Sequence, residues 1–377
     1  MATIPTDALA PYDAVLVHSF GGPEAPDEVM PFLERVTAGR GIPANRLAEV
    51  AEHYYDRGGA SPINDETRAV CRALTDELTR REVFRPVAWG SRFAQPFTAQ
   101  TLAEMAEQGH RRVVVVPTSA YPSYSGCRAY REDLASAVAE AGVADRLVID
   151  RLRPYALHPG FSATTVRLVT DGVRRLLATS GLPAAAVHVL YVTHSIPVAQ
   201  DDASGPPPGG HYRRWHEGLA TAVTAEVAAT LGAEFASDLV YCSRSGPPGQ
   251  PWLEPDVSAA MAALAQDGVR GVVLAPIGFT SDHMEVVYDL DEVAAATARR
   301  LGLAFCRVPT VRADPEFVSG LVDLLLERAA EARGEQPRRP SWPKLGDPLP
   351  SVCAAGCCPN PRGARPALCG QDPSETR

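Results

Sequence analysis

The chain has 377 residues and a formal net charge of −9, and hydrophobic residues make up 45% of it. This length can form two domains of ordinary size, and this composition excludes a largely disordered protein. The acidic charge and the lack of a run of Lys and Arg argue against nucleic acid as a partner, because phosphate binding depends on a basic surface.

Residues 1–10 contain neither the basic region nor the apolar region of a secretory signal. No apolar stretch of the sequence approaches the roughly 20 residues that are needed to span a bilayer. We therefore expect a cytoplasmic protein without a transmembrane segment.

Short apolar runs alternate with amphipathic segments rich in Ala and Leu. This alternation is typical of βαβ units, whose parallel strands are covered on both faces. We therefore expect an α/β fold with parallel sheets. The expected strands are Ala14–Val17, Val87–Trp89, Val113–Val116, Leu147–Asp150, Val187–Val192, Leu239–Cys242 and Val272–Ala275, and expected helices include Asp65–Arg81, Ala99–Gln108 and Asp133–Ala141.

The two halves of the chain resemble each other weakly, since a Val-rich strand in each is followed by polar residues and a Pro or Gly turn. This pattern indicates two similar lobes, residues 11–170 and 171–333, although chance similarity among Val-rich strands is the alternative. Ligands of such sheets bind beyond the carboxyl ends of the strands. Residues expected at those ends, and therefore in one cleft between the lobes, are His18, Tyr121, His194, Ser243 and Phe279.

His194 directly follows an apolar strand. It could be a structural histidine, but an imidazole with an ordinary pKa near 6.5 can also accept protons or bind ferrous iron.

A row of carboxylates follows the last expected strand. Asp282, Glu285, Asp289 and Glu292 have the spacing of one helix face, and His283 stands at the entrance of that helix. Such a row can be a solvated surface, or it can be a path for a hard divalent cation, which prefers oxygen ligands.

The segment after residue 333 differs in character. It begins as a tether rich in Pro, Arg and Gly and ends in Cys353, Cys357, Cys358 and Cys369. Because disulfides are disfavoured in the cytoplasm, this cysteine cluster indicates a metal site in a separate tail, residues 334–377.

Several motifs together resemble the ferrochelatase family, in the right order over about residues 12–325. The signature-like stretch is Thr193-His194-Ser195-Ile196-Pro197. Further matching stretches are Phe20-Gly21-Gly22-Pro23, Gly58–Asn64, Tyr124-Ser125-Gly126-Cys127, Ser243–Pro248 with Trp252–Asp256, and Gly278-Phe279 with Ser281-Asp282-His283 and Glu285.

This resemblance implies two Rossmann-like, chelatase-type lobes with a porphyrin cleft between them. His194 and Glu285 would face each other there. One would bind the incoming Fe²⁺ and the other would take pyrrole protons, and the resemblance does not decide which residue has which role. The possible metal path, which follows from the acidic row itself, would consist of Asp282, His283, Asp289 and Glu292 beside Glu285. Porphyrin contacts would come from Ser61, Tyr130, His53, Tyr54 and Arg40. Glu24 stands where some relatives have a tyrosine, so the resemblance does not extend to a tyrosine metal ligand.

The tail resembles an extension that holds a [2Fe–2S] cluster in some ferrochelatases. Such a cluster needs four thiolates, and zinc with four thiolates is the alternative. The candidates are four of the five cysteines Cys353, Cys357, Cys358, Cys127 and Cys369.

The tail and the Tyr-Ser-Gly-Cys motif resemble actinobacterial enzymes, which implies coproporphyrin III as the substrate, with protoporphyrin IX as the alternative. More distant alternatives are a cobalt or nickel chelatase of a corrin-type precursor and a non-catalytic haem carrier with His194 as axial ligand. Expected partners are the porphyrin and, transiently, neighbouring enzymes of haem synthesis.

Overall fold

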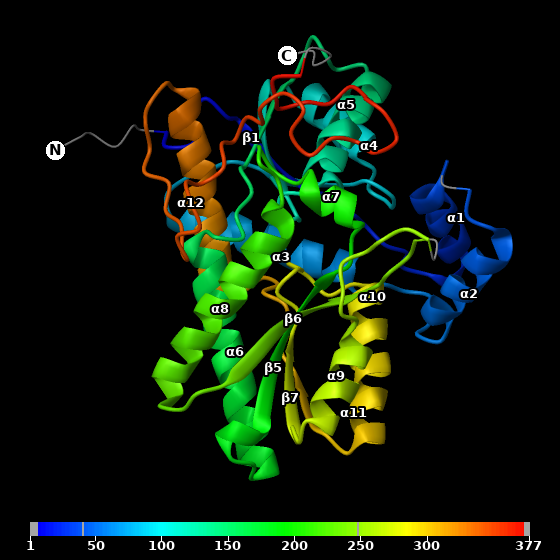
Figure 1. Ribbon diagram of the computed structural model, residues 1–377. Coiled ribbons are helices and arrows are strands. Elements are labelled where there is room, and N and C mark those ends of the chain that lie inside the picture. Colours follow the sequence, from blue (N-terminus) through cyan, green and yellow to red (C-terminus); the bar gives the residue numbers. More distant parts are fainter. Residues whose placement is uncertain (1–6, 40, 247–248, 373–377) are drawn as a thin grey trace.

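The computed structural model describes residues 7–39, 41–246 and 249–372. Within them, the chain forms two parallel four-stranded sheets with helices on both faces (Figure 1). The predicted α/β fold with two sheets is therefore confirmed. In the described part of the chain, no helix has the length and apolar character needed to cross a membrane.

The first sheet has the strand order β2-β1-β3-β4. Its strands are β1 (Ala14–Ser19), β2 (Val87–Ser91), β3 (Arg112–Pro117) and β4 (Val148–Arg151). The helical segments that accompany it are α1 (Pro26–Thr37), α2 (Ala44–Tyr55), α3 (Ile63–Arg80), α4 (Thr98–Glu107), the π-helix η1 (Tyr124–Arg128) and α5 (Ala129–Ala141).

The second sheet has the equivalent order β6-β5-β7-β8, which agrees with the weak similarity between the two halves of the sequence. Its strands are β5 (Val187–His194), β6 (Ala236–Cys242), β7 (Gly271–Ala275) and β8 (Ala304–Arg307). The remaining helical segments are α6 (Pro159–Ser180), η2 (Ala184–Ala186), α7 (Val198–Asp202), α8 (His211–Leu231), α9 (Val257–Gln266), α10 (Met284–Val286), the π-helix η3 (Val287–Ala294), α11 (Ala295–Leu301) and α12 (Pro315–Ala332).

Alternate residues of each central strand enter different cores, as strand geometry requires. Leu16 of β1 faces the core under α4 and α5, whereas Val15 and Val17 face a second core. In β5, Leu190 faces the core under α9 and α11, whereas Tyr191 enters the same second core as Val15. That second core therefore runs continuously through both lobes.

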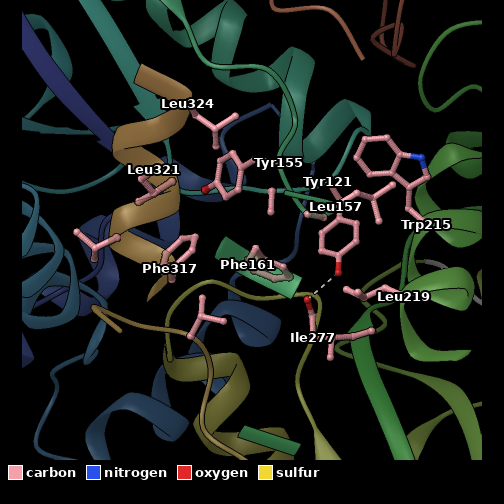
Figure 2. Close-up of a cluster of buried hydrophobic side chains, with 14 of the residues drawn as sticks. Tyr121, Tyr155, Leu157, Phe161, Trp215, Leu219, Ile277, Phe317, Leu321 and Leu324 are labelled. Atoms are coloured by element: carbon pink, nitrogen blue, oxygen red, sulfur yellow. Dashed lines mark hydrogen bonds between the residues drawn. The ribbon is translucent and has the colours of Figure 1, made fainter. Parts of the chain in front are cut away.

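Figure 2 shows this shared core, in which α12 packs against both α3 and α6. Tyr121, in the loop after β3, donates a hydrogen bond from its hydroxyl to the carbonyl of Ile277 after β7, at 3.0 Å. A buried hydrogen bond of this kind stabilises by about 1 kcal/mol, and here it joins the carboxyl ends of the two sheets. The lobes are thus held together just behind the region where a ligand is expected.

Candidate active site

His194 is the last residue of β5, and its backbone is held on both sides. Its carbonyl accepts a hydrogen bond from the Tyr212 hydroxyl at 2.9 Å, and the next residue, Ser195, bonds the carbonyls of Cys242 and Leu253, each at 2.8 Å. Nδ1 of His194 contacts the carbonyl of Ser195. Because a carbonyl only accepts, Nδ1 must carry the hydrogen, and Nε2 of the neutral ring then offers its lone pair to the cleft.

Glu285 faces that lone pair from the other side. Its Oε2 lies 3.6 Å from Nε2 of His194 and 4.0 Å from Nδ1 of His283. Burial by itself lowers the pKa of His194, but the nearby Glu285 carboxylate, together with the Ser195 carbonyl and the charge of Asp289, raises that pKa overall. Burial dominates at His283, whose pKa is lowered.

The loop that brings Glu285 to this place crosses the end of β5 at very short range. A Cβ atom on Gly278 would lie 2.1 Å from Oγ1 of Thr193, the neighbour of His194. Gly278 also donates its backbone N–H to the carbonyl of Val192 at 3.1 Å. Only glycine permits this approach, so Gly278 determines how the two sides of the site meet.

Asp289 is the second carboxylate on this side. It accepts a hydrogen bond from the hydroxyl of Ser243, a residue held at a φ of 59° in the loop after β6. Burial raises the pKa of Asp289 to about 6, against the lowering effect of the Ser243 hydrogen bond, and the charge of Glu285 adds to the rise. Two carboxylates that repel each other in this way favour a bound divalent cation.

The other two members of the expected acidic row are bonded to arginines. Asp282 is buried and accepts hydrogen bonds from Arg307 at 2.7 Å, from Arg312 and from Thr310 at 3.0 Å. Glu292 forms an ion pair with Arg57. The row also departs from the expected regular α-helix, because residues 287–294 form a π-helix, a wider turn that is frequent at functional sites.

An apolar wall lies beside Glu285. It joins α1, α2 and the loop after β2 to Met284. Tyr54 belongs to this wall, and its pKa is raised mainly by burial and further by the charge of Glu285. The partly exposed members of the wall are Phe20, Met30, Val36, Leu47, Val50 and Phe93. Mostly apolar walls with a few polar groups are typical of ligand sites. Our sequence reasoning missed this wall, although the amphipathic segments 26–37 and 44–55 carry its signal.

Of the expected porphyrin contacts, Arg40 lies outside the described residues. His53 stacks on Tyr288 of the second lobe with ring centroids 3.6 Å apart, and Tyr54 belongs to the apolar wall. Tyr130 packs against His18 at 5.1 Å, and Ser61 lies against Gly22. Glu24 is bonded to Asn64 and Arg68.

Four cysteines gather where the tail lies over the first lobe (the red segment in Figure 1). Sγ of Cys127 lies 4.0 Å from Sγ of Cys353, and the sulfurs of Cys357 and Cys358 lie 3.8 Å apart. Among the described residues, no group of His, Cys, Asp and Glu has the geometry of a preformed metal site. Cys369 is adjacent in backbone, since its carbonyl accepts a hydrogen bond from the N–H of Cys353 at 3.4 Å, but its thiol is directed to the carbonyl of Ile149, also at 3.4 Å.

The chemistry of the four thiols nevertheless fits a metal–sulfur centre. They are close enough to share one, and two N–H donors point at the sulfurs: the Arg151 guanidinium toward Cys127 at 2.9 Å and the backbone of Gly205 toward Cys358 at 3.1 Å. Hydrogen bonds to ligand sulfurs are typical of iron–sulfur sites.

Two duplicated parallel sheets with a histidine–carboxylate pair between them define a two-lobed α/β protein of the chelatase type. The family model "Ferrochelatase" matches residues 12–329. The chain therefore belongs to the ferrochelatase family, whose members are enzymes that insert iron into a porphyrin.

Curated relatives match almost the whole chain. The coproporphyrin III ferrochelatases of Streptomyces griseus and Streptomyces coelicolor are each 48% identical over 96% of this chain and 97% of their own. That of Leifsonia xyli is 45% identical over 96% of this chain and 95% of its own. Among solved structures, the sirohydrochlorin chelatase SirB of Bacillus subtilis is 12% identical, with a TM-score of 0.46 over 85% of this chain and 97% of its own.

Proposed function

We propose that this ferrochelatase inserts Fe²⁺ into coproporphyrin III, and protoporphyrin IX is the alternative substrate. The observation that supports this most is the pair of Nε2 of His194 and Oε2 of Glu285, 3.6 Å apart at the carboxyl end of β5. The coproporphyrin III ferrochelatases that match nearly the full chain support the choice of porphyrin.

Metallation of a porphyrin forms bonds from iron to the pyrrole nitrogens and releases two N–H protons. We assign proton acceptance to His194, because its Nε2 carries the free lone pair and Glu285 raises its pKa. We assign the incoming ion to Glu285 and Asp289, whose carboxylates repel each other when no cation is bound. His194 remains within reach of the same ion.

The metal path that we propose includes fewer residues than the path expected from the sequence. Asp282 is neutralised by Arg307 and Arg312, and Glu292 by Arg57. We therefore place the path on Glu285 and Asp289, with His283 beside them, and give Asp282 and Glu292 the role of holding the loop and the π-helix in place.

Porphyrin binding is proposed for Ser61, Tyr130, His53 and Tyr54 together with the apolar wall of α1 and α2. The stack of His53 on Tyr288 supports closure of this wall against the second lobe. We also propose that residues 11–170 and 171–333 act as the two lobes and residues 334–377 as the tail.

We further propose that Cys127, Cys353, Cys357 and Cys358 hold a [2Fe–2S] cluster, with zinc as the alternative metal. When bound, such a cluster supplies a redox-active metal centre that ties the tail to the first lobe. Reduced thiols of this kind suit the cytoplasm, where we place the protein. Transient contacts with neighbouring enzymes of haem synthesis belong to the same proposal.

The test is a direct comparison of substrates under anaerobic conditions. Purified protein with Fe²⁺ should convert the free-base spectrum of coproporphyrin III to the metallated spectrum faster than that of protoporphyrin IX. Equal or reversed rates would contradict the choice of porphyrin, and no conversion of either would refute iron insertion. Cobalt or nickel insertion into a corrin-type precursor, measured in parallel, distinguishes the more distant alternative.

A further inference from the structure

Arg151 is the last residue of β4 and is only 3% exposed. Its guanidinium donates to Sγ of Cys127 at 2.9 Å and to Sγ of Cys353 at 3.4 Å, while its Nε is buried without a hydrogen-bond partner. A buried charge without a counter-charge costs several kcal/mol. The buried positive charge of Arg151 therefore requires a negatively charged group close to the cysteines.

Each of the other buried arginines in the described part of the chain is paired with a carboxylate. Arg128 pairs with Glu132, Arg153 with Glu327 and Arg328 with Asp150. Arg131 reaches Asp372. No carboxylate of the described residues lies within ion-pair distance of Arg151, whose neighbours are sulfur atoms. Among the described residues, the sulfurs are the groups that can supply the counter-charge of Arg151.

We propose that Arg151 is the counter-ion of the four-sulfur metal centre formed by Cys127, Cys353, Cys357 and Cys358. This inference rests on the proposed cluster and names the positioning residue that the cluster needs. An oxidised [2Fe–2S] cluster with four thiolates is a dianion, and zinc with four thiolates is a dianion as well. Either one supplies the negative charge that the buried guanidinium lacks.

The guanidinium of Arg151 also links the tail to the first lobe. Cys127 belongs to η1 of the first lobe, whereas Cys353 belongs to the tail, and one guanidinium bonds both. Arg151 therefore holds a cysteine of the first lobe and a cysteine of the tail together, although they are 226 residues apart in the sequence. The N–H of Gly205, in the loop after α7, donates to Cys358 at 3.1 Å.

The test compares Arg151→Met and Arg151→Lys with the wild-type holoprotein. Iron, acid-labile sulfide and the visible and EPR spectra are measured as isolated, and the reduction potential is measured by redox titration. Arg151→Met should lower affinity for the metal centre by about tenfold or more, as loss of an outer-shell partner does. Any cluster that remains should have a lower reduction potential, because reduction adds negative charge that the guanidinium no longer balances. Arg151→Lys keeps the charge and should retain more of the centre.

Arg153→Met is the matched control, because Arg153 is equally buried, lies two residues further on and pairs with a carboxylate, Glu327, at 2.6 Å. It should lower thermal stability yet leave the metal content and the reduction potential unchanged. Wild-type metal content and potential in Arg151→Met would overturn the proposal. If the wild-type protein holds zinc, the same loss is read from zinc affinity.

A wild-type protein that holds neither metal would refute both the centre and the role of Arg151. Iron insertion is read in the separate porphyrin assay, so failure here and failure of the proposed function are distinguishable.

Discussion

Nε2 of His194 and the carboxylate of Glu285 lie 3.6 Å apart, although they come from β5 and from the short helix after β7. The contact requires the Gly278 backbone to pass directly over Thr193. It couples the two groups electrostatically, because Glu285 raises the pKa of His194.

His194→Ala should lower the rate of iron insertion by a factor on the order of 10²–10⁴, the usual contribution of a positioned acid or base. Porphyrin affinity, measured by a spectral shift or by fluorescence quenching, should change little because the apolar wall is intact. His188→Ala is the control at the other end of β5, where His188 bonds Asp238 at 2.8 Å. A variant at position 194 with the wild-type rate would remove this histidine from the chemistry.

Glu285→Gln should lower the pKa of His194, because it removes the charge that raises it. If His194 must be neutral to accept a proton, the acid limb of the pH–rate profile should move to lower pH while the maximal rate falls. Glu292→Gln, on the same helical segment but paired with Arg57, should leave the position of that limb unchanged. An unshifted limb in Glu285→Gln would show that the limb does not report His194.

Asp289→Asn should raise the apparent KM for Fe²⁺, by roughly tenfold or more on the scale of a lost metal-site partner. Because the pKa of Asp289 is raised to about 6, the wild-type KM for iron should also rise as the pH falls below about 6. The variant should lose that part of the pH dependence. Asp291→Asn is the control, since Asp291 pairs with Arg307 at 3.0 Å, outside the His194–Glu285 pair. Identical pH dependence in Asp289→Asn and wild type would contradict a role in iron binding.

Glu66 predicts a pH effect on stability. It joins α3 to the second lobe through Arg312 at 3.0 Å and the N–H of Asp282 at 2.7 Å. Burial, followed by the charge of Asp282, raises its pKa from 4.5 to about 7 despite Arg312. A raised carboxyl pKa contributes stability that is fully present below about pH 4.5 and is lost as the pH rises through about 7.

Glu66→Gln keeps an acceptor for the Asp282 N–H but cannot ionise. Between pH 5 and 8.5, the wild-type free energy of unfolding should therefore fall relative to that of the variant, by about 1–3 kcal/mol. Denaturant titrations at the two pH values measure this difference. Asp65→Asn, on the exposed side of the same helix, should follow the wild type. Parallel pH curves for Glu66→Gln and wild type would show that Glu66 is not buried as described.

Much of the fold could be predicted because buried parallel strands must be apolar along their whole length. The seven expected strands lie within one to three residues of those observed. The strand β8 escaped prediction, since Ala304–Arg307 is short and lies at an edge of the sheet, where its side chains are mostly half-buried and need no continuous apolar run. The π-helices η1 and η3 carry no sequence period that distinguishes them from α-helices.

By itself the sequence determined the α/β class, the residue types at the strand ends and the order of motifs that belongs to the ferrochelatase family, because these depend on local pattern. Only the tertiary structure decided which of these side chains act together. Asp282, Glu285, Asp289 and Glu292 are equivalent in spacing, yet arginines from distant segments neutralise the first and the last. Cys127 and Cys369 were both candidates, yet the thiol of Cys127 packs with those of Cys353 and Cys358, whereas the thiol of Cys369 is turned to the carbonyl of Ile149. The physical reason is the same in both cases: a charge or a thiol acquires its role from partners across space, and the chain brings those partners together only when it folds.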